Sequence, residues 1–283
     1  MKAVVPAKAL TAAVKAARDA GKLMRANWHL PKRVNFADAH DIKLELDVRS
    51  QKLIGKILRK AFPKIPLLGE EGCTGNINSD YRWVVDPIDG TVNYFFGMPH
   101  AAVSIALQSK SDKWQVAGDK KNSRKHNHVT CHTTHVTLLG VIYDPFANEL
   151  WTVIRGGPTR LNGKIVRVSN RSKLEDAVIA MGFSKSSENL KKSLPHLNRL
   201  ARRALKIRIM GSAALELAYV ASGRLDVYFE RTINLWDIAA GALMVECSGG
   251  EFWAKPAPGK FKYRMVADNG KLRKKLQLGS LLK

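Results

Sequence analysis

The amino-acid sequence predicts a mixed α/β (α+β) fold in which strands and helices alternate. Its 283 residues are 45% hydrophobic and 25% charged, which is typical of a globular chain with a sizeable core. Short apolar runs such as "IPLL" and "WVV" alternate with longer stretches of helical periodicity. Two of these runs end in carboxylates, at "GEE" and at "DPID". In open α/β folds the strand ends form the ligand crevice, so the functional site is expected there.

The first part of the chain predicts two amphipathic helices with a short strand between them. After Pro6, apolar residues recur at near-helical spacing, at Leu10, Val14, Ala17 and Met24. The stretch "DIKLELD" predicts an alternating strand around Lys43 to Asp47, which leads into a second helix that Pro63 closes. One face of that helix carries Leu53, Ile54, Ile57 and Leu58.

Strand signals follow at "IPLLGEEG", "RWVVDPID" and "PHAAVSIALQ", the last of buried type. The stretch "TLLGVIYDPFANELWTVIRGG" predicts a hairpin around an Asp144-Pro145 turn. "GSAALELAYVASG" predicts a helix that Ser212 caps and Gly223 ends. "RLDVYFE" then predicts a strand, and "NLWDIAAGALMVECSGG" predicts a helix that stops at Gly249.

Residues 109–136 interrupt this alternation. They are polar, basic and rich in histidine, and they lack a sustained apolar period, which is typical of an insertion or a long loop. We expect the insertion to contribute little to the core, so that joining Ala117 to Gly140 should preserve the fold. A zinc site is an alternative reading of the ligand types in this stretch, although no ligand pair has a finger-like partner pair; the candidate ligands are His126, His128, Cys131, His132 and His135.

The chain is strongly basic, with 47 Lys and Arg against 24 Asp and Glu and a formal net charge of +23. Such a charge favours phosphorylated substrates or contacts with nucleic acid. One basic cluster has helical spacing and predicts a stripe on one helix face, which can also be an ordinary solvated face; it comprises Arg199, Arg202, Arg203 and Lys206.

No apolar run approaches the roughly 18 residues that span a bilayer, so we expect a water-soluble protein without a membrane partner. The three cysteines form no CxxC pair, and they are too few for a disulfide framework. A reducing, cytoplasmic location is therefore predicted.

Carboxylates gather where apolar elements end or begin, at Glu70, Glu71, Asp86, Asp89 and Asp237. Acids that share one crevice repel each other unless a cation lies between them. Oxygen ligands without nearby His or Cys indicate a hard ion, Mg²⁺ or Mn²⁺.

Pro87 forces a turn after Asp86, so Asp89 can fold back toward Asp86 and the Ile88 carbonyl can point inward. Gly90-Thr91 then opens a short helix, whose free N–H groups suit a phosphate. Taken alone, the Asp86 to Asp89 segment could be an ordinary capped turn, and Asp237 could be an ordinary helix cap.

The combination of motifs resembles the inositol monophosphatase family. The resemblance rests on "GEE" (Gly69 to Glu71), "WVVDPIDGTVNY" (Trp83 to Tyr94) and "WDIAAGALMVECSGG" (Trp236 to Gly250). It implies a layered α-β-α-β-α sandwich of the inositol monophosphatase and sugar phosphatase type, in a homodimer. The chain would then form one unit, with a metal- and phosphate-binding half at residues 1–145 and a half with the substrate contacts and Asp237 at residues 146–283.

The resemblance also implies roles for individual residues. About two or three Mg²⁺ ions would be bound by Glu70, Asp86, the Ile88 carbonyl, Asp89 and Asp237. Phosphate would lie on the Gly90-Thr91 amides, and a metal-bound water positioned by Glu70 and Thr91 would attack phosphorus, with Asp47 as a supporting acid. The chain departs from the family at Leu44, where members commonly carry threonine, which affects the hydrogen bonds expected around Asp47.

Within the family, Thr91 and Asn93 resemble the branch that hydrolyses inositol monophosphate. Ser212, Ala213 and Glu230 stand where that branch contacts inositol hydroxyls, and Glu230 could accept two hydrogen bonds from a polyol. A surface acid at a strand end is the alternative for Glu230. The family also includes phosphatases of histidinol phosphate, sugar bisphosphates and nucleotide bisphosphates. A second class of function is a basic nucleic-acid-associated protein that uses the fold as a scaffold.

Overall fold

The computed structural model describes residues 4–37, 42–110, 135–183 and 187–279. Its helices are α1 (Pro6–Ala26), α2 (Glu45–Ala61), α3 (Thr91–Phe95), α4 (Ser187–Ala201), α5 (Ala213–Ala221), α6 (Leu235–Cys247) and α7 (Arg273–Leu276), with a 3₁₀ turn at Leu174–Asp176. Among the helices of these ranges, none has both the length and the apolar character needed to cross a bilayer.

Two large sheets form the framework. The first has eight strands in the order β10-β9-β8-β7-β6-β5-β3-β4, and the second has five in the order β12-β11-β13-β15-β14. The small β1–β2 pair (Val34–Ala37, Ile42–Leu44) stands apart. The first sheet comprises β3 (Leu67–Gly69), β4 (Gly72–Thr74), β5 (Tyr81–Asp89), β6 (Ala102–Lys110), β7 (His135–Asp144), β8 (Glu149–Ile154), β9 (Arg160–Leu161) and β10 (Lys164–Ile165). The second comprises β11 (Val178–Met181), β12 (Lys206–Arg208), β13 (Val227–Asn234), β14 (Glu251–Pro256) and β15 (Lys262–Asp268).

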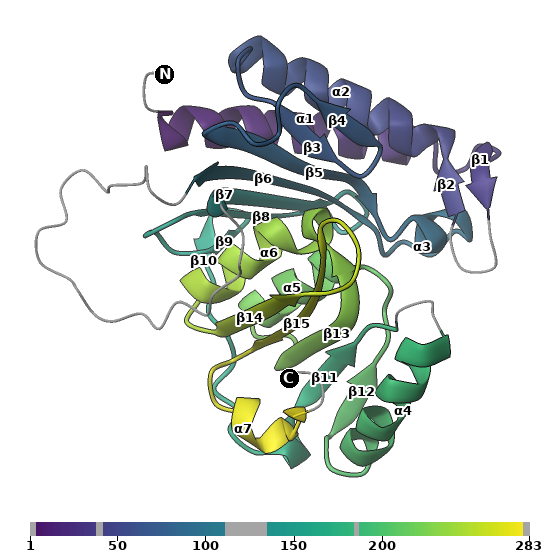
Figure 1. Ribbon diagram of the computed structural model, residues 1–283, viewed down its shortest axis with the longest axis vertical. Helices are drawn as coiled ribbons and strands as arrows, with labels where there is room; N and C mark the ends of the chain where they lie inside the picture. The colour runs from purple at the N-terminus through teal and green to yellow at the C-terminus, as the bar shows by residue number, and fades with distance from the viewer. Residues whose placement is uncertain (1–3, 38–41, 111–134, 184–186, 280–283) are drawn as a thin grey trace, which may run out of the picture.

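The elements stack in five layers (Figure 1). Helices α1 and α2 cover one face of the eight-stranded sheet, α5 and α6 lie between the two sheets, and α4 and α7 lie beyond the five-stranded sheet. The predicted α-β-α-β-α sandwich is therefore confirmed.

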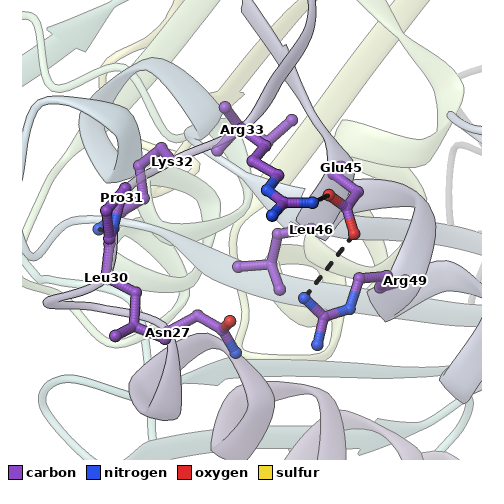
Figure 2. Close-up of a pocket in the computed structure, with 9 residues that line it drawn as sticks. Asn27, Leu30, Pro31, Lys32, Arg33, Glu45, Leu46 and Arg49 are labelled. Carbon is purple, nitrogen blue, oxygen red and sulfur yellow. Dashed lines mark hydrogen bonds and ion pairs between the residues drawn. The ribbon is translucent and has the colours of Figure 1, made fainter.

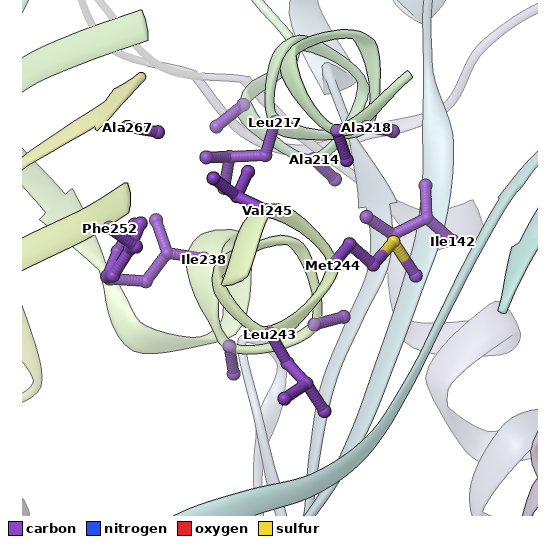
Figure 3. Packing of buried hydrophobic residues seen from close by; sticks show 14 of the residues in the cluster. Ile142, Ala214, Leu217, Ala218, Ile238, Leu243, Met244, Val245, Phe252 and Ala267 are labelled. Carbon is purple, nitrogen blue, oxygen red and sulfur yellow. The ribbon is translucent and has the colours of Figure 1, made fainter. Parts of the chain in front are cut away.

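Helix α6 is apolar around most of its circumference because it is buried between two sheets. Figure 3 shows Met244 of α6 beside Ile142 on one side of the helix and Ile238 beside Phe252 on the other. At Gly241, an added Cβ would lie 2.5 Å from the Cβ of Leu217 on α5. The absence of a side chain at Gly241 therefore allows α5 and α6 to approach closely.

The structure corrects the extent of the predicted insertion. Strand β7 begins at His135 and pairs with β6 from the register His135 to Lys110 onward, and Leu138 and Leu139 are fully buried core residues. Residues 135–139 are therefore part of the sheet, and joining Ala117 to Gly140 would remove half of a central strand. The remaining stretch, residues 111–134, lies outside the described residues.

Of the candidate zinc ligands, the structure describes His135 alone. His135 lies in β7, buried, with Nε2 2.9 Å from the carbonyl oxygen of Ser79. The other four candidate ligands lie outside the described residues.

The prediction that the basic cluster forms a stripe on a single helix face is also wrong. Helix α4 ends at Ala201, and Lys206 begins β12 after a turn. The Arg199 guanidinium donates to the carbonyls of Leu276 and Gln277, at 3.0 and 2.8 Å, so it joins α4 to the α7 segment. The cluster is divided between a helix, a turn and a strand.

The predicted boundary between residues 145 and 146 lies in the turn between β7 and β8, which pair antiparallel from Asp144–Glu149 to Leu139–Ile154. The eight-stranded sheet continues past this turn to Ile165. The division of function between two halves stays a prediction.

Candidate metal centre

Asp86 and Asp89 lie at the end of the central strand β5, all nine residues of which are buried. The pairing of β5 with β6 shifts between these two residues: Asp86 faces Ser104, whereas Asp89 faces Ala102. The Ile88 N–H donates to Asp86 Oδ1 at 3.0 Å, which is the side-chain-to-backbone bond of an Asx turn. The turn predicted from Pro87 is therefore present, and it brings the two carboxylates together.

Asp237 joins them from the first turn of α6, where its Oδ2 accepts the Asn234 N–H at 2.9 Å. One oxygen from each of Asp86, Asp89 and Asp237 lies within 4.8 Å of the others. These three acids come from sequence positions about 150 residues apart at most, and the structure places them in one cluster, called the aspartate cluster below.

Burial and mutual repulsion disfavour charge on the aspartate cluster. Burial, followed by the charge of Glu70, raises the pKa of Asp86 well above its usual value. Burial and the neighbouring charge of Asp89 do the same for the pKa of Asp237. Burial raises the pKa of Asp89 to about 6, although Ser212 and the backbone N–H groups of Ala213 and Ala214 donate to it. A divalent cation among the carboxylates would remove this penalty.

The two glutamates predicted for the site, Glu70 and Glu71, have different partners. The charge of Glu70 raises the pKa values of Asp86, Asp237 and Asp47, so Glu70 borders the cluster. Its backbone N–H donates to the Val85 carbonyl at 3.2 Å, which fixes the turn after β3 beside β5. Glu71 instead forms an ion pair with Lys43 at 3.3 Å.

Asp47 lies in a helix, not at the end of a strand as predicted. Strand β2 stops at Leu44 and α2 begins at Glu45. Asp47 Oδ2 accepts the Leu44 N–H at 2.6 Å, which satisfies a free donor at the helix start. The Leu44 side chain has no hydroxyl and forms no capping hydrogen bond at the start of α2. Burial raises the pKa of Asp47 to about 8, against the effect of this hydrogen bond.

Thr91 connects Asp47 to the β5 turn. Its hydroxyl donates to the Ile88 carbonyl at 2.8 Å and lies 3.5 Å from Asp47 Oδ1. Gly90, just before it, has a φ of 90°, and an added Cβ would lie 2.8 Å from the His100 carbonyl oxygen. Glycine is therefore required at the start of α3 for both conformation and space.

Ser212 and Ala213 lie beside the aspartate cluster, but Ser212 does not cap α5 with its side chain. The Ser212 hydroxyl donates to Asp89 Oδ2, and the Ala214 N–H donates to the same oxygen at 2.8 Å. The Ala213 N–H lies 3.3 Å from Asp89 Oδ1. The start of α5 therefore holds Asp89 in place, a role that sequence reasoning did not foresee.

A second set of polar groups, called the glutamate–tyrosine cluster below, comprises the buried Glu216 and Tyr228 and the half-buried Glu230. Glu216 Oε1 accepts the Met210 N–H at 3.0 Å, and the Tyr228 hydroxyl donates to Glu230 Oε2 at 2.6 Å. Burial, then the charge of Glu230, raises the pKa of Glu216 to about 8. Sequence reasoning missed Glu216, although an acid inside the apolar run "AALELAYVA" is an unusual signal.

Asn93 joins the α3 segment to the loop before α5. Its Nδ2 donates to the carbonyls of His100 and Met210, at 2.9 and 2.8 Å. Because Met210 also donates to Glu216, the loop that carries Ser212 is fixed from both sides.

The chemistry of the donor set matches a hard divalent cation. The aspartate cluster offers three carboxylate oxygens at close range, and the charge of Glu70 acts on two of its members. Ligand sets made only of oxygen are typical of Mg²⁺ sites.

Comparison with known proteins agrees with this geometry. A profile of the inositol monophosphatase family matches residues 6–118 and 128–269. The chain is 38% identical over 251 residues to Nus factor SuhB of Pseudomonas aeruginosa, covering 85% of this chain and 83% of the relative. It is 35% identical over 245 residues to Nus factor SuhB of Escherichia coli K12, with the same two shares.

Solved structures give the same result. The extragenic suppressor protein suhB of Bartonella henselae superposes with a TM-score of 0.80 at 33% identity, covering 96% of this chain and 98% of that one. An inositol monophosphatase from Anabaena superposes with a TM-score of 0.75 at 30% identity, covering 97% and 96%. From the sequence profile, these relatives and the shared fold, the chain belongs to the inositol monophosphatase family.

Proposed function

We propose that the chain is a Mg²⁺-dependent phosphomonoesterase that hydrolyses a small phosphorylated polyol, with myo-inositol monophosphate as the first candidate. The observation that carries this proposal is the aspartate cluster, in which three carboxylate oxygens lie within 4.8 Å of each other. Membership in a family of metal-dependent phosphatases supports the reaction class. The substrate within that class is part of the proposal.

In this proposal Glu70, Asp86, the Ile88 carbonyl, Asp89 and Asp237 hold the cations, which Mn²⁺ could replace. When bound, Mg²⁺ supplies positive charge that lowers the pKa of water and neutralises the phosphoryl oxygens. The carboxylates would give up the protons that burial favours, because a bound cation stabilises their charged form.

The chain's own residues orient the reactants. Because the Thr91 hydroxyl donates to the Ile88 carbonyl, its lone pairs can accept a hydrogen bond from a water molecule. We assign Glu70 and Thr91 to the positioning of that water, with the Glu70 carboxylate as proton acceptor, and Asp47 to the support of Thr91. The N–H groups of Gly90 and Thr91 would bind the phosphate.

The polyol would be recognised across the second sheet. Glu230 is half-buried on β13, and Tyr228 already donates to one of its oxygens, which fixes the carboxylate for hydrogen bonds from vicinal hydroxyls. Ser212 and Ala213, which donate to Asp89, are proposed as further contacts to the polyol.

A phosphate-release screen tests this proposal. The panel holds inositol monophosphates, sugar phosphates, sugar bisphosphates, nucleotide bisphosphates and histidinol phosphate. We expect the highest kcat/KM with inositol monophosphate, complete loss of activity in excess chelator, recovery with Mg²⁺ and inhibition by lithium. Activity that persists in chelator would overturn the mechanism, and preference for another member of the panel would replace the substrate.

The variant Thr91→Ala separates the positioning of water from the binding of metal. Thr91→Ala should lower kcat while leaving the Mg²⁺ concentration for half-maximal activity within about threefold, because its hydroxyl is assigned to water and not to the cation. We further propose a cytoplasmic homodimer, which sedimentation at several protein concentrations would check.

A second candidate function is association with nucleic acid. Two observations favour it: the net charge of +23, and relatives named as a Nus factor and not as an enzyme. Binding of RNA near physiological salt, with an affinity that falls steeply as salt rises, is the expected result. The absence of such binding at about 50 mM salt would exclude this candidate.

A further inference from the structure

From Val48 onward, the charged side chains of α2 and of the segment after it are all basic. Residues 48–64 contain six Lys and Arg residues and no Asp or Glu. Four of the cations are exposed on successive turns of the helix, at Lys52, Lys56, Arg59 and Lys60. In the part of the chain that the structure describes, no ion pair is found for any of these four side chains.

These four cations line a groove of about 490 Å³ between α2 and the β3–β4 edge of the eight-stranded sheet. Gly55 leaves room in its floor, because an added Cβ would meet only Leu67 at 3.7 Å and the Arg59 guanidinium at 3.9 Å. We call this the α2 groove. Since β4 is the edge strand, the groove is open along the side of the sheet.

The walls of the α2 groove are joined by Gln51. Its Nε2 donates to the Gly72 carbonyl at 3.1 Å, and its Oε1 accepts the Glu71 N–H at 2.9 Å. Helix α2 is thereby tied to the β3–β4 turn. The groove therefore has a defined width without any bound partner.

A neighbouring cavity shows a basic site whose cations have partners within the chain. It has about 430 Å³ and is lined by residues near the end of α1 and the start of α2. Figure 2 shows Arg33 and Arg49 both directed at Glu45, with ion pairs of 3.8 and 4.0 Å. Lys32 donates there to the carbonyls of Trp28 and Leu30. Among the described residues that line the α2 groove there is no Asp or Glu, so its cations are available to an external anion.

The spacing of these cations is unfavourable for the helix alone. Lys52 and Lys56, and Lys56 and Lys60, are like-charged pairs at i,i+4, which destabilise a helix. A solvated helix face normally mixes both signs of charge. The unmixed sign in a preformed groove indicates a polyanionic partner.

We infer that the α2 groove binds the phosphate backbone of a nucleic acid, an inference that rests on the second candidate function and gives it a location. From Lys52 to Lys60 the helix rises about 12 Å. At the spacing of about 3.4 Å per strand in duplex geometry, this distance covers roughly three successive phosphates. A phosphorylated metabolite would contact only part of such a row.

The test compares the wild-type chain with two variants, each with four cations changed to glutamine. The groove variant is Lys52→Gln, Lys56→Gln, Arg59→Gln and Lys60→Gln. The control variant is Arg202→Gln, Arg203→Gln, Lys206→Gln and Arg208→Gln, which has the same charge change beside α4, on the opposite side of the molecule from α2 (Figure 1). The probe is a fluorescein-labelled oligouridylate of roughly 12 nucleotides, titrated between about 50 and 200 mM salt.

The groove variant should bind at least about tenfold more weakly, and its slope of log affinity against log salt should be flatter by about 2, from roughly three lost phosphate contacts on a single strand. The control variant should keep most of the wild-type affinity and slope. The melting temperature of the groove variant should not fall, because like-charge repulsion in α2 is relieved. Its phosphatase activity should stay within about twofold of wild type, since the groove is not part of the aspartate cluster.

Equal binding by the groove variant and wild type would overturn this location while leaving the second candidate function in place. Equal losses in both variants would also overturn it, since they would indicate a diffuse charge effect. No binding by the wild-type chain would overturn the location and the second candidate together.

Discussion

The two buried acidic clusters of this molecule differ in how their charge is offset. In the aspartate cluster, Asp86, Asp89 and Asp237 face one another, and their donors are mainly backbone N–H groups. In the glutamate–tyrosine cluster, a phenol hydroxyl donates to Glu230 and a backbone N–H donates to Glu216. Both clusters have raised carboxyl pKa values for the same first reason, which is burial.

The difference indicates two ways of keeping acids inside a protein. Two carboxyls with a tyrosine between them can be accommodated by one retained proton, because a protonated acid is no longer a buried charge. Three carboxyls with an adjacent Glu70 carry more repulsion than the local donors offset, as the pKa values of Asp86 and Asp237 show. We therefore expect the aspartate cluster to respond to a divalent cation and the glutamate–tyrosine cluster to respond only to protons.

The largest expected effect comes from Asp89→Asn, which removes one anionic ligand without changing size. We expect kcat/KM to fall by at least about 10²-fold, by analogy with the loss of one electrostatic contact in other enzymes. The metal-free melting temperature should be unchanged or higher, because repulsion within the cluster decreases.

Steady-state kinetics and thermal melts with and without Mg²⁺ would check this prediction, with the exposed acid of Asp176→Asn as a control. An Asp89→Asn variant with wild-type turnover would show that the turn at Asp86 to Asp89 is only structural.

The second prediction concerns the stability of the metal-free chain as pH changes. Unfolded aspartates titrate near about pH 3.9, whereas burial raises the folded pKa to about 6 for Asp89 and about 8 for Asp47. A raised folded pKa means that the stability present below the unfolded pKa is lost as pH rises through the folded pKa. The metal-free chain should therefore lose stability between about pH 4 and pH 8.

Magnesium should oppose this loss, because it binds the deprotonated carboxylates. The stabilisation by Mg²⁺, measured as a shift in melting temperature against chelator, should grow from about pH 5 to pH 8. A shift that is constant or shrinks over this range would contradict the assignment of a cation to the aspartate cluster.

The parts of the site that the sequence predicts are those set by local chemistry. Pro87 and Gly90 dictate the turn and the short helix around Asp86 and Asp89, so their geometry could be read from neighbouring residues. The apolar runs before Glu70 and Asp86 likewise predict strands, which the structure contains as the paired strands β3 and β5. The resemblance to a known family added the layered architecture, which periodicity alone does not specify.

The features that sequence reasoning missed depend on contacts between distant residues or on ambiguous periods. Ser212 suits a helix cap, yet its hydroxyl donates to Asp89, which is 123 positions away. The alternation in "KLELD" fits a strand, yet the hydrogen bond from Leu44 to Asp47 starts α2 at Glu45. The residues His135 and Val136 fall in the predicted insertion because their neighbours are polar, but pairing with β6 makes them part of β7.

The third prediction concerns the hydrogen bonds that the start of α5 donates to Asp89. Ser212→Ala removes the hydroxyl donor but keeps the N–H of Ala214 on the same carboxylate oxygen. A hydrogen bond to a charged group contributes about 1.5–3 kcal/mol, and part of this is retained through the backbone donor. We expect kcat/KM to fall about tenfold and the Mg²⁺ requirement to rise, whereas Ser212→Thr, which keeps a hydroxyl, should recover part of the rate. Identical kinetics for all three chains would leave Ser212 with a packing role only.

The smallest effect on turnover is expected from Glu216→Gln, in the glutamate–tyrosine cluster. The amide oxygen of glutamine can still accept the Met210 N–H, so the loop that carries Ser212 should keep its position, and kcat/KM should stay within about threefold of wild type.

The effect of Glu216→Gln on stability should instead depend on pH. Burial raises the pKa of Glu216 to about 8 from the model-compound value of 4.5, so the wild-type chain loses stability from this group as pH rises through that interval. Glutamine does not titrate, and the variant should gain stability relative to wild type on the order of a few kcal/mol near pH 8, but not near pH 5. Denaturant unfolding at both pH values, each with Mg²⁺ and with chelator, measures this difference. Because the donors of this cluster are protein groups, the gain should be the same with and without Mg²⁺. A gain that disappears in Mg²⁺, or a turnover loss as large as that of Asp89→Asn, would place Glu216 in the same metal-dependent network and remove the distinction between the two clusters.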